Sequence, residues 1–359
     1  GFTQFVHDTD IAHSQHIIRE LLEVLIDSNE LGLQISEIEG DAILFYRFGQ
    51  APTVASLLAQ IQKMYVNFHL HLKKYETHRI CSCGACKGTA QLSLKFIVHY
   101  GHILQNQVKN FSKLFGKEVI VAHRLLKNQV EHEEYALFTS SLVNACSTWV
   151  ELPVAAWSPV EHQSETYDSG KIDYCFIDMN PLARHVPEPE IEDYSLVGKS
   201  AHVFESEAVI EAPIEEVFSI VADLPWRTKW IPDTMEQTDH LNHEILQNGA
   251  THRCLANGPV VVTHDFSAEP DKITFTETDS KGRYCVVYSL YRLDDKRTRM
   301  RADFLMKKHL IMNALFRLFM KKKMLQTYEA AWQALRKYCQ QLRLSGRQHP
   351  YRIVLEPAA

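Results

Sequence analysis

The sequence contains no run of about 18 or more apolar residues, so no membrane-spanning helix is expected. It also lacks an excess of positive charge, because 38 Lys and Arg stand against 44 Asp and Glu and give a formal net charge of -6. Proteins that bind nucleic acid usually carry a basic surface, and we therefore expect no nucleic-acid partner. No signal peptide and no internal repeat are visible, which predicts a cytoplasmic protein.

What the sequence does contain is enough apolar material for two domains. Of 359 residues, 45% are hydrophobic and 23% are charged, so each half can bury a core of its own. Of the eight cysteines, only Cys81, Cys83 and Cys86 lie close together in the chain. The others are scattered through apolar stretches, which is typical of reduced cysteines.

The N-terminal half shows an alternation of helix and strand signals. Apolar spacing predicts a helix over residues 11–28 and a hairpin over 33–48 that turns at Glu39-Gly40-Asp41. A helix is expected from Pro52 to about Tyr75, a strand over 94–101 and a short helix over 117–128. With a further strand leading into Gly1, this order predicts a ferredoxin-like α+β fold.

The rest of the chain predicts a connector and a second domain. Residues 151–200 hold five prolines and an acidic run, which indicates a connector between domain 1–150 and domain 201–345, with 346–359 as a tail. From His202 onward the signals give a strand, two short helices, a meander of strands and one long helix over about 308–343.

Three motifs of the N-terminal half, in order, resemble those of class III nucleotide cyclases. The segment Gly1-Phe2-Thr3 is similar to the end of D-I-x-G-F-T, residues 37–41 are similar to x-T-I-G-D, and residues 116–124 are similar to G-x-x-V-N-x-A-x-R. The strand LKFIVHYG is also similar to the family's strand ending in H-x-G. The resemblance covers roughly residues 1–145 and implies a homodimer.

The resemblance implies a role for each matched residue. Gly1, Phe2, Thr3 and Gly40 would bind the nucleotide phosphates, Asp41 would hold Mg²⁺ or Mn²⁺, Glu37 and Lys113 would select the purine base, and Arg124 would steady the transition state. The second metal carboxylate of the family would stand just before Gly1.

One residue departs from the family's motif. Ile120 occupies the position of a catalytic Asn, and an Ile side chain donates no hydrogen bond. A degenerate module that binds a purine nucleotide, or that only dimerises, is therefore one interpretation. An active cyclase that uses two divalent metals is the other. The simplest alternative for Asp41 is that it only closes a turn.

A compact group of soft ligands follows the second predicted helix. His78, Cys81, Cys83 and Cys86 could hold a tetrahedral Zn²⁺, and such a site would be structural because four protein ligands leave no open position. An iron–sulfur cluster is a lesser option. Free thiols or a disulfide in a surface loop are the plain alternative.

The C-terminal half resembles the SRPBCC superfamily of START-like and polyketide-cyclase-like helix-grip proteins. The resemblance rests on residues 207–218, on Asp223-Leu224-Pro225 and on Trp230. It implies a curved antiparallel sheet around a long C-terminal helix, with an apolar pocket for a hydrophobic small molecule or lipid. The predicted lining is Trp226, Trp230, Phe266, Phe275, Tyr288, Tyr291 and Phe304, although each of these could simply fill the core.

Basic residues flank an apolar stretch near the end of the chain. Lys307 and Lys308 precede LIMNALFRLFM, and residues 321–323 are all Lys. This pattern is compatible with contact to an anionic membrane surface, but an apolar helix face that grips the sheet explains it more simply. Taken together, the sequence predicts a signalling or sensor protein with a degenerate cyclase-like module and a hydrophobic-ligand site. A ligand-modifying enzyme is disfavoured because no catalytic set is recognisable.

Overall fold

The computed structural model of the chain divides into two units, each described here by itself. The first unit holds Phe5, Ile17–Lys74 and Gly88–Pro189, and the second holds Val6–His16, Tyr75–Lys87 and Glu190–Ala359. The structure describes residues 5, 11–109, 111–146, 157–167, 170–190, 200–231, 239–240, 249–253 and 260–355.

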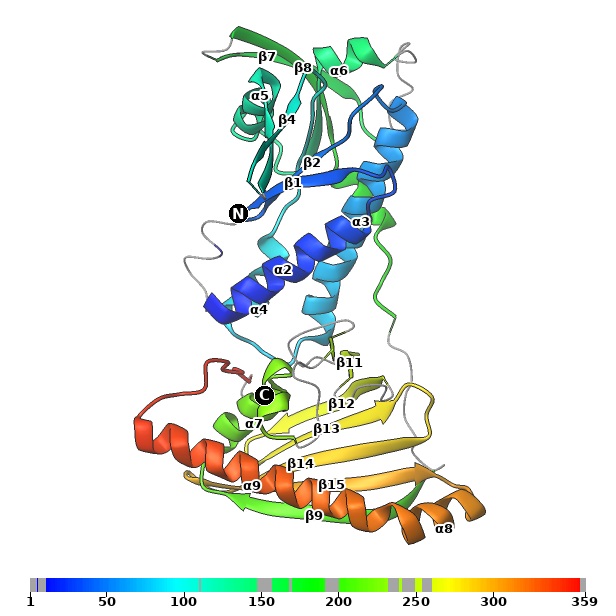
Figure 1. Ribbon diagram of the computed structural model, residues 1–359, viewed down its shortest axis with the longest axis vertical. Coiled ribbons are helices and arrows are strands. Elements are labelled where there is room, and N and C mark those ends of the chain that lie inside the picture. Colours follow the sequence, from blue (N-terminus) through cyan, green and yellow to red (C-terminus); the bar gives the residue numbers. More distant parts are fainter. Residues whose placement is uncertain are drawn as a thin grey trace. The chain divides into compact units, whose positions relative to one another are not determined.

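A four-stranded sheet organises the first unit (Figure 1). Its order is β3 (Phe96–Val98), β6 (Tyr135–Thr139), β8 (Gly170–Asp178) and β7 (Val160–Tyr167), with β3 parallel to β6 and the other pairs antiparallel. Strand β6 alternates between two cores. Ala136 and Phe138 pack with α3 (Val54–His78), whereas Tyr135 and Leu137 pack with α5 (Lys117–Leu125). Helix α3 therefore packs on one face of this sheet and α5 on the other.

Two hairpins complete the strands described for this unit. The predicted hairpin is confirmed as β1 (Gln34–Glu39) and β2 (Ala42–Tyr46), and Gly40 at its turn has φ 62°. Strands β4 (Leu104–Val108) and β5 (Phe111–Phe115) form the other. Among the described residues each hairpin is a sheet of its own. The remaining elements of residues 11–189 are α2 (Ile11–Asp27), α4 (Gly84–Gly88), η1 (Thr89–Gln91), α6 (Ser140–Ala145) and η2 (Asn180–His185).

The segment predicted as a connector contains structure instead. Residues 160–178 form β7 and β8, and β8 is a central strand of the first sheet. Tyr174 and Phe176 of β8 pack with α5, while Cys175 and Ile177 pack with α3. The prolines predicted a connector, but they lie outside these two strands, where they interrupt no sheet hydrogen bond.

A seven-stranded antiparallel sheet organises the second unit. Its order is β10 (Asp239–His240), β11 (Thr251–Arg253), β12 (Val261–Glu269), β13 (Lys272–Asp279), β14 (Tyr284–Asp294), β15 (Arg297–Lys307) and β9 (Ser200–Ile210). Between β9 and β10 lie α7 (Ile214–Ala222) and η3 (Pro225–Lys229). The predicted order of a strand, two short helices, a meander and a closing helix is confirmed, as is the α+β class.

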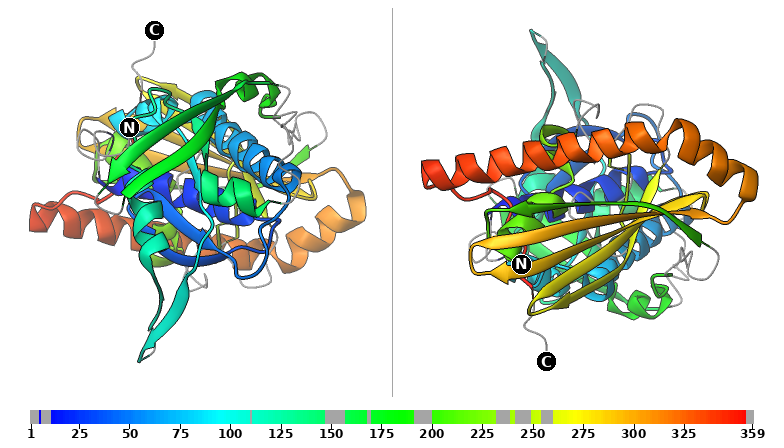
Figure 2. Two further views of the ribbon diagram at one scale, coloured as in Figure 1. Left: turned by 90° about the horizontal axis from the view of Figure 1, so that it is seen from above. Right: turned by 90° about the horizontal axis from the view of Figure 1, so that it is seen from below.

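The closing helix runs across one face of this sheet (Figure 2). It is two helices rather than one, α8 (Leu310–Phe319) and α9 (Lys321–Ser345), and Met320 at their junction has φ -108°. Helix α9 buries Trp332, Leu335 and Cys339, and the Trp332 indole donates a 2.9 Å hydrogen bond to Ser206 Oγ. The sheet and α9 therefore form the helix-grip arrangement expected from the sequence.

The residues after α9 pack against other elements of the second unit. Gly346, with φ 64°, ends α9 in the left-handed conformation that glycine tolerates best. His349 and Ile353 are both buried. His349 Nε2 lies 3.0 Å from Asp223 Oδ2, and Ile353 N–H donates to Ser219 Oγ. The predicted tail is therefore packed up to these positions. Within the described residues no helix is both long enough and apolar enough to cross a bilayer.

Candidate functional site

Four soft ligands from two distant parts of the chain converge in the second unit. His13 Nδ1 lies 3.2 Å from Cys83 Sγ, 3.6 Å from Cys81 Sγ and 3.7 Å from Cys86 Sγ. All four ligand atoms lie within 4.8 Å of one another. The three cysteines are free thiols, and each is at most 9% exposed. The thiols therefore face one another and His13 rather than solvent.

Local structure explains how the ligands meet. Cys81 and Cys83 lie in the loop that follows α3, and Cys86 lies in α4. His13 comes from the first turns of α2. The sequence predicted His78 as the fourth ligand, and this was wrong, because His78 is the last residue of α3 and stands outside the group.

The spacing of the ligand atoms fits a tetrahedral metal. With Zn–N near 2.1 Å and Zn–S near 2.3 Å, tetrahedral ligands place the nitrogen about 3.6 Å from each sulfur. The observed N···S distances of 3.2, 3.6 and 3.7 Å bracket this value. One His and three Cys are a donor set that Zn²⁺ uses in structural sites. These residues could therefore hold zinc with little rearrangement.

The electrostatics of the cluster also favour a cation. Burial opposes charge on His13, but hydrogen bonds that its imidazolium donates to the Cys81 and Cys83 sulfurs raise the pKa of the imidazole to about 10. The thiols of Cys81 and Cys86 lower the pKa of Cys83, against the effect of burial. Hydrogen bonds with Cys81 and Cys83, together with burial, raise the pKa of Cys86. The thiolate form of Cys83 is thus stabilised, and ionisation of Cys86 is disfavoured. A metal that binds would displace the protons that remain on the sulfurs.

The C-terminal segment closes the cluster. Val354 N–H donates to Cys81 Sγ at 3.3 Å, and Ser82 N–H donates to the Val354 carbonyl at 2.5 Å. The ring of Tyr351 lies 5.6 Å from that of His13, centroid to centroid. Backbone N–H groups that donate to metal-binding sulfurs are a common outer-shell feature of metal sites. With four protein ligands and this cover, the cluster has no open coordination position.

The predicted ligand-binding residues of the C-terminal half divide between the two faces of the sheet. Phe275 stacks on Tyr288 with centroids 4.9 Å apart, and Phe304 stacks on Phe204 at the same distance. Phe204 in turn contacts Tyr328 of α9. These rings therefore belong to the interior between the sheet and α9.

Three further residues predicted to line the pocket are Phe266, Trp226 and Trp230, and two of them contact helices of the second unit. Phe266 packs on Phe218 of α7, with centroids 5.7 Å apart. Trp230 is buried. Trp226 is half-buried and contacts Tyr338 of α9 at 5.3 Å.

Tyr291 was wrongly assigned to this interior. It stands three residues after Tyr288 on β14, and side chains of a strand alternate between faces. Tyr291 pairs with Arg299 and Lys272 in the sheet, and the Arg299 guanidinium lies 4.7 Å from the ring centroid. The side chain therefore belongs to the opposite face, where two cations contact it.

A buried charge pair lies in the interior, and no motif or spacing in the sequence predicts it. Arg227 of η3 and Glu277 of β13 form a 2.6 Å ion pair, and their side chains are only 3% and 8% exposed. Arg227 Nε also donates to the Val221 carbonyl. The Tyr288 and Tyr328 hydroxyls lie 3.5 Å apart, and burial raises the pKa of both phenols. Charged and hydroxyl groups thus meet among aromatic rings.

The first unit brings together some of the residues predicted to bind a nucleotide. Glu37 Oε1 lies 3.0 Å from His123 Nε2, and Glu37 Oε2 lies 3.6 Å from Lys113 Nζ. The two predicted base-selecting side chains therefore pair with each other. Arg124 follows His123 on α5. Gly1, Phe2 and Thr3 lie outside the described residues.

Asp41 lies at the turn between β1 and β2, and Gly40 precedes it there. Partial burial raises the pKa of the Asp41 carboxyl, and the positive charge of Lys95 works against this shift. A polar hollow of about 260 Å³ is lined by other residues, namely Gln91, Ser93, Lys95, Asn128, Val130, His132, Glu133 and Tyr135. The predicted nucleotide-binding residues do not line this hollow.

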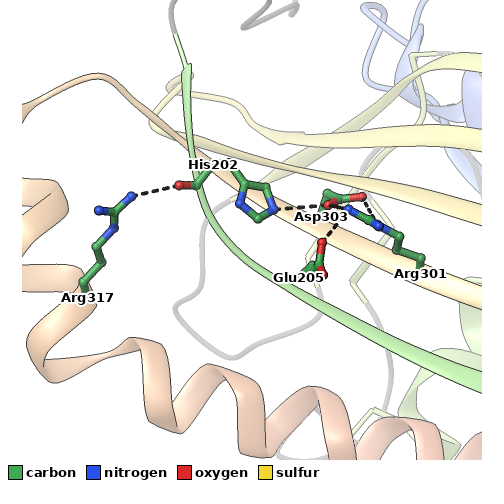
Figure 3. A network of polar contacts seen from close by, with 5 residues as sticks. All are labelled: His202, Glu205, Arg301, Asp303 and Arg317. Atoms are coloured by element: carbon green, nitrogen blue, oxygen red, sulfur yellow. Dashed lines mark hydrogen bonds and ion pairs between the residues drawn. The ribbon is translucent and has the colours of Figure 1, made fainter.

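A second group of oxygen and nitrogen ligands lies on β9 and β15 (Figure 3). His202 Nε2 lies 3.2 Å from Asp303 Oδ1. Arg301 donates to both Asp303 oxygens at 2.7 Å and to Glu205 at 2.5 Å. Arg317 of α8 donates to the His202 carbonyl. The Arg301 guanidinium occupies the place where a cation would sit, so this group is an ion-pair network.

Comparison with known proteins gives a family but no activity. Residues 18–135 match the family model described as "Protein of unknown function (DUF2652)". Among solved structures, the ZhuI aromatase/cyclase of Streptomyces sp. R1128 is 16% identical, with a TM-score of 0.29 over 41% of this chain and 99% of that protein. The ginseng (Panax ginseng) major latex-like protein 151 is 11% identical, with a TM-score of 0.30 over 39% of this chain and 98% of that protein. At these TM-scores the two structures say nothing more about this chain.

A curated relative extends further along the chain than the family model. The Mycobacterium tuberculosis protein named "Uncharacterized protein Rv2561/Rv2562" is 31% identical over 179 residues, which are 50% of this chain and 80% of the relative. Neither it nor the family model provides evidence for the class III cyclase homology, which stays a prediction. On this identity and coverage, the chain belongs to the family of Mycobacterium tuberculosis Rv2561/Rv2562.

Proposed function

We propose that the protein is a non-catalytic sensor whose second unit binds a hydrophobic small molecule that carries one hydrogen-bonding group. The observation that supports this most directly is the buried Arg227–Glu277 pair beside the Tyr288 and Tyr328 hydroxyls. Sites for small molecules are mostly apolar and hold a few convergent polar groups that orient the ligand. The interior between the sheet and α9 has this composition.

The energetics of the pair favour a ligand role over a purely structural one. Each buried ion costs several kcal/mol of hydration, and a buried pair is often no more stabilising than apolar side chains of similar volume. Both charges act on the pKa values of the Tyr288 and Tyr328 phenols, so the pair lies near aromatic side chains, and apolar packing would have served the core equally well. A ligand hydroxyl or carbonyl would add the hydrogen bonds that a desolvated charge pair needs.

Phenol-to-phenyl substitutions test the proposal. The purified protein is denatured in organic solvent, and the released compounds are identified by mass spectrometry. Tyr288→Phe and Tyr328→Phe should lower the amount of retained compound about tenfold, because each removes a hydroxyl and leaves its ring. Tyr291→Phe is the matched control, since it changes the same strand on the opposite face. Equal retention by all three variants, or no retained compound in the wild type, would contradict the proposal.

The His13–Cys81–Cys83–Cys86 cluster would serve this function as a structural zinc site. It would tie α2 and the loop after α3 to the C-terminal segment, because Val354 bonds to Cys81. Iron–sulfur ligation is less suitable, because nitrogen is an uncommon ligand for such clusters.

The first unit would act by self-association. Leu104 and Phe115 are direct cross-strand neighbours on the β4–β5 hairpin, and they are 70% and 67% exposed. Ile120 on α5 is 54% exposed. Exposed apolar groups of this kind are typical of interaction surfaces. Leu104→Asp should convert a homodimer to a monomer in analytical ultracentrifugation, whereas Leu293→Asp in the second unit should not.

Catalysis by the first unit is not part of this proposal. Ile120 is exposed on α5 and cannot donate the hydrogen bond that the cyclase family obtains from Asn. We expect no cyclic nucleotide from ATP or GTP with Mg²⁺ or Mn²⁺. Cyclic nucleotide formed by the wild type and lost in Asp41→Ala would establish the alternative, an active cyclase.

A further inference from the structure

Helix α8 exposes nearly all of its apolar side chains. Leu310 is 93% exposed, Leu318 74%, Phe319 68% and Ile311 67%, and no residue of the helix is buried. Phe316 stacks on the sheet, against Phe304 with centroids 5.3 Å apart. Solvent exposure of so many large apolar groups on one short helix is typical of an interaction surface.

The apolar surface has a fixed orientation. Phe316 contacts β15, and Arg317 donates to the His202 carbonyl of β9 at 2.9 Å. Ile311, Leu315 and Leu318 follow the spacing i, i+4, i+7 and form one stripe on a different side of the helix from Phe316. Since the helix is anchored through Phe316 and Arg317, this stripe is left without protein cover among the described residues.

The charges around α8 have one sign. Between Asp303 and Glu329 the sequence contains no acidic residue, whereas it contains five Lys and one Arg, in a chain of net charge -6. Lys307 lies just before the helix, and Lys322 and Lys323 follow it, all three exposed. The apolar stripe therefore lies between two clusters of positive charge.

We infer that α8 docks the protein on a bilayer surface that carries anionic lipid. Leucine and phenylalanine that enter the acyl boundary, with lysines that pair with headgroup phosphates, are what an interfacial helix requires. A second copy of this chain fits less well, because a symmetric contact through α8 would place lysines against lysines. This inference does not depend on the ligand proposed for the interior.

Vesicle binding tests the inference with the full chain. Vesicles of phosphatidylcholine are compared with vesicles containing about 30% phosphatidylserine, at low and high salt. The wild type should co-sediment with the anionic vesicles only, and salt should weaken this binding. Equal binding to both vesicle types, or to neither, would overturn the inference.

Charge variants locate the contact. Each lysine near an anionic surface contributes about fivefold in affinity, so replacing Lys321, Lys322 and Lys323 by Gln should weaken binding about a hundredfold. The control is Lys281→Gln with Lys296→Gln, two exposed lysines on sheet turns. If the control weakens binding as much as the triple variant does, α8 is not the site.

Apolar variants separate a bilayer from a second copy. Leu318→Ser with Phe319→Ser should lower vesicle binding at least tenfold, whereas Leu344→Ser, exposed by 77% on α9, should leave it unchanged. Both α8 residues are exposed, so their replacement should not affect folding. Self-association that is lost in the α8 variant, without any vesicle binding by the wild type, would assign α8 to a protein contact instead.

Discussion

Replacement of Cys83 by Ser should remove the metal from the cluster and destabilise the second unit. Cys83 is the closest thiol to His13, with Sγ 3.2 Å from Nδ1, and hydrogen bonds with Cys81 and Cys86 lower its pKa. A serine hydroxyl is not a useful zinc ligand at neutral pH. The variant therefore keeps three of the four ligands and loses the sulfur that lies nearest to His13.

The magnitude follows from the number of ligands. Structural Zn²⁺ binds with an apparent free energy of about 10–16 kcal/mol at neutral pH, or about 3 kcal/mol for each of four ligands. A loss of about 3 kcal/mol in a unit of this size should lower the melting temperature by about 6–12 °C. Full removal of the metal by a chelator costs as much as the whole stability of an ordinary domain.

Metal content and thermal unfolding measure the effect together. The wild type should contain one zinc per chain by mass spectrometry, and Co²⁺ in its place should give the sulfur-to-cobalt charge-transfer absorption of thiolate ligation. Cys83→Ser should fall well below one metal per chain. Cys339→Ser, which changes a buried thiol of α9 outside the cluster, should keep the full metal content. Wild-type protein that contains no metal, and whose melting temperature does not change when a chelator is added, would refute the reasoning.

Three further predictions concern buried groups. Glu277→Gln should cost about 3–5 kcal/mol in denaturant unfolding, because it removes the carboxylate charge that faces Arg227 in the interior; a cost near zero would mean that the pair is hydrated. His349→Phe should cost about 3 kcal/mol and make the C-terminal segment sensitive to protease, because the buried Asp223 carboxylate loses its 3.0 Å partner; unchanged protease resistance would show that the segment is held elsewhere. Burial raises the pKa of Cys339 from its ordinary 9.0 to about 12, so native protein should react with iodoacetamide about a thousandfold more slowly at that thiol than unfolded protein does. Since the pKa in the folded state is the higher one, the stabilising contribution of the neutral thiol is complete below pH 9 and is lost as the pH rises through about 12; a stability profile that is flat over this range in wild type and Cys339→Ala alike would contradict the assignment.

The metal cluster shows how far the sequence could lead. Its three cysteines were recognisable because they lie within six residues, and soft ligands at that spacing are uncommon without a metal. The fourth ligand was not recognisable, because His13 reaches the cluster only when α2 packs beside the loop after α3. His78 is closer to the three cysteines in the sequence than His13 is. However, it is the last residue of α3, and the helix fixes the direction of its side chain, which stands outside the ligand group.

The fold was easier to predict than the interior of the grip. Apolar periodicity located α2, α3 and the order of the second unit, because these depend on local patterns of burial. The Arg227–Glu277 pair joins a short helix to a strand, and no spacing rule relates the two residues. Tyr291 stands three positions after Tyr288 on β14, and residues an odd number of positions apart on a strand lie on opposite faces, so the two rings cannot line one pocket.

The position of the Val354 amide beside Cys81 has a consequence for biosynthesis. The ribosome releases His13 early, the cysteine loop later, and the segment that covers the sulfurs only near the completion of this stretch of chain. Until then the thiols lack their cover and remain open to oxidation or to exchange of one metal for another. With a metal bound, arrival of the C-terminal segment would turn an exchangeable set of ligands into a covered one, so that the metal held when translation reaches residue 354 would be retained.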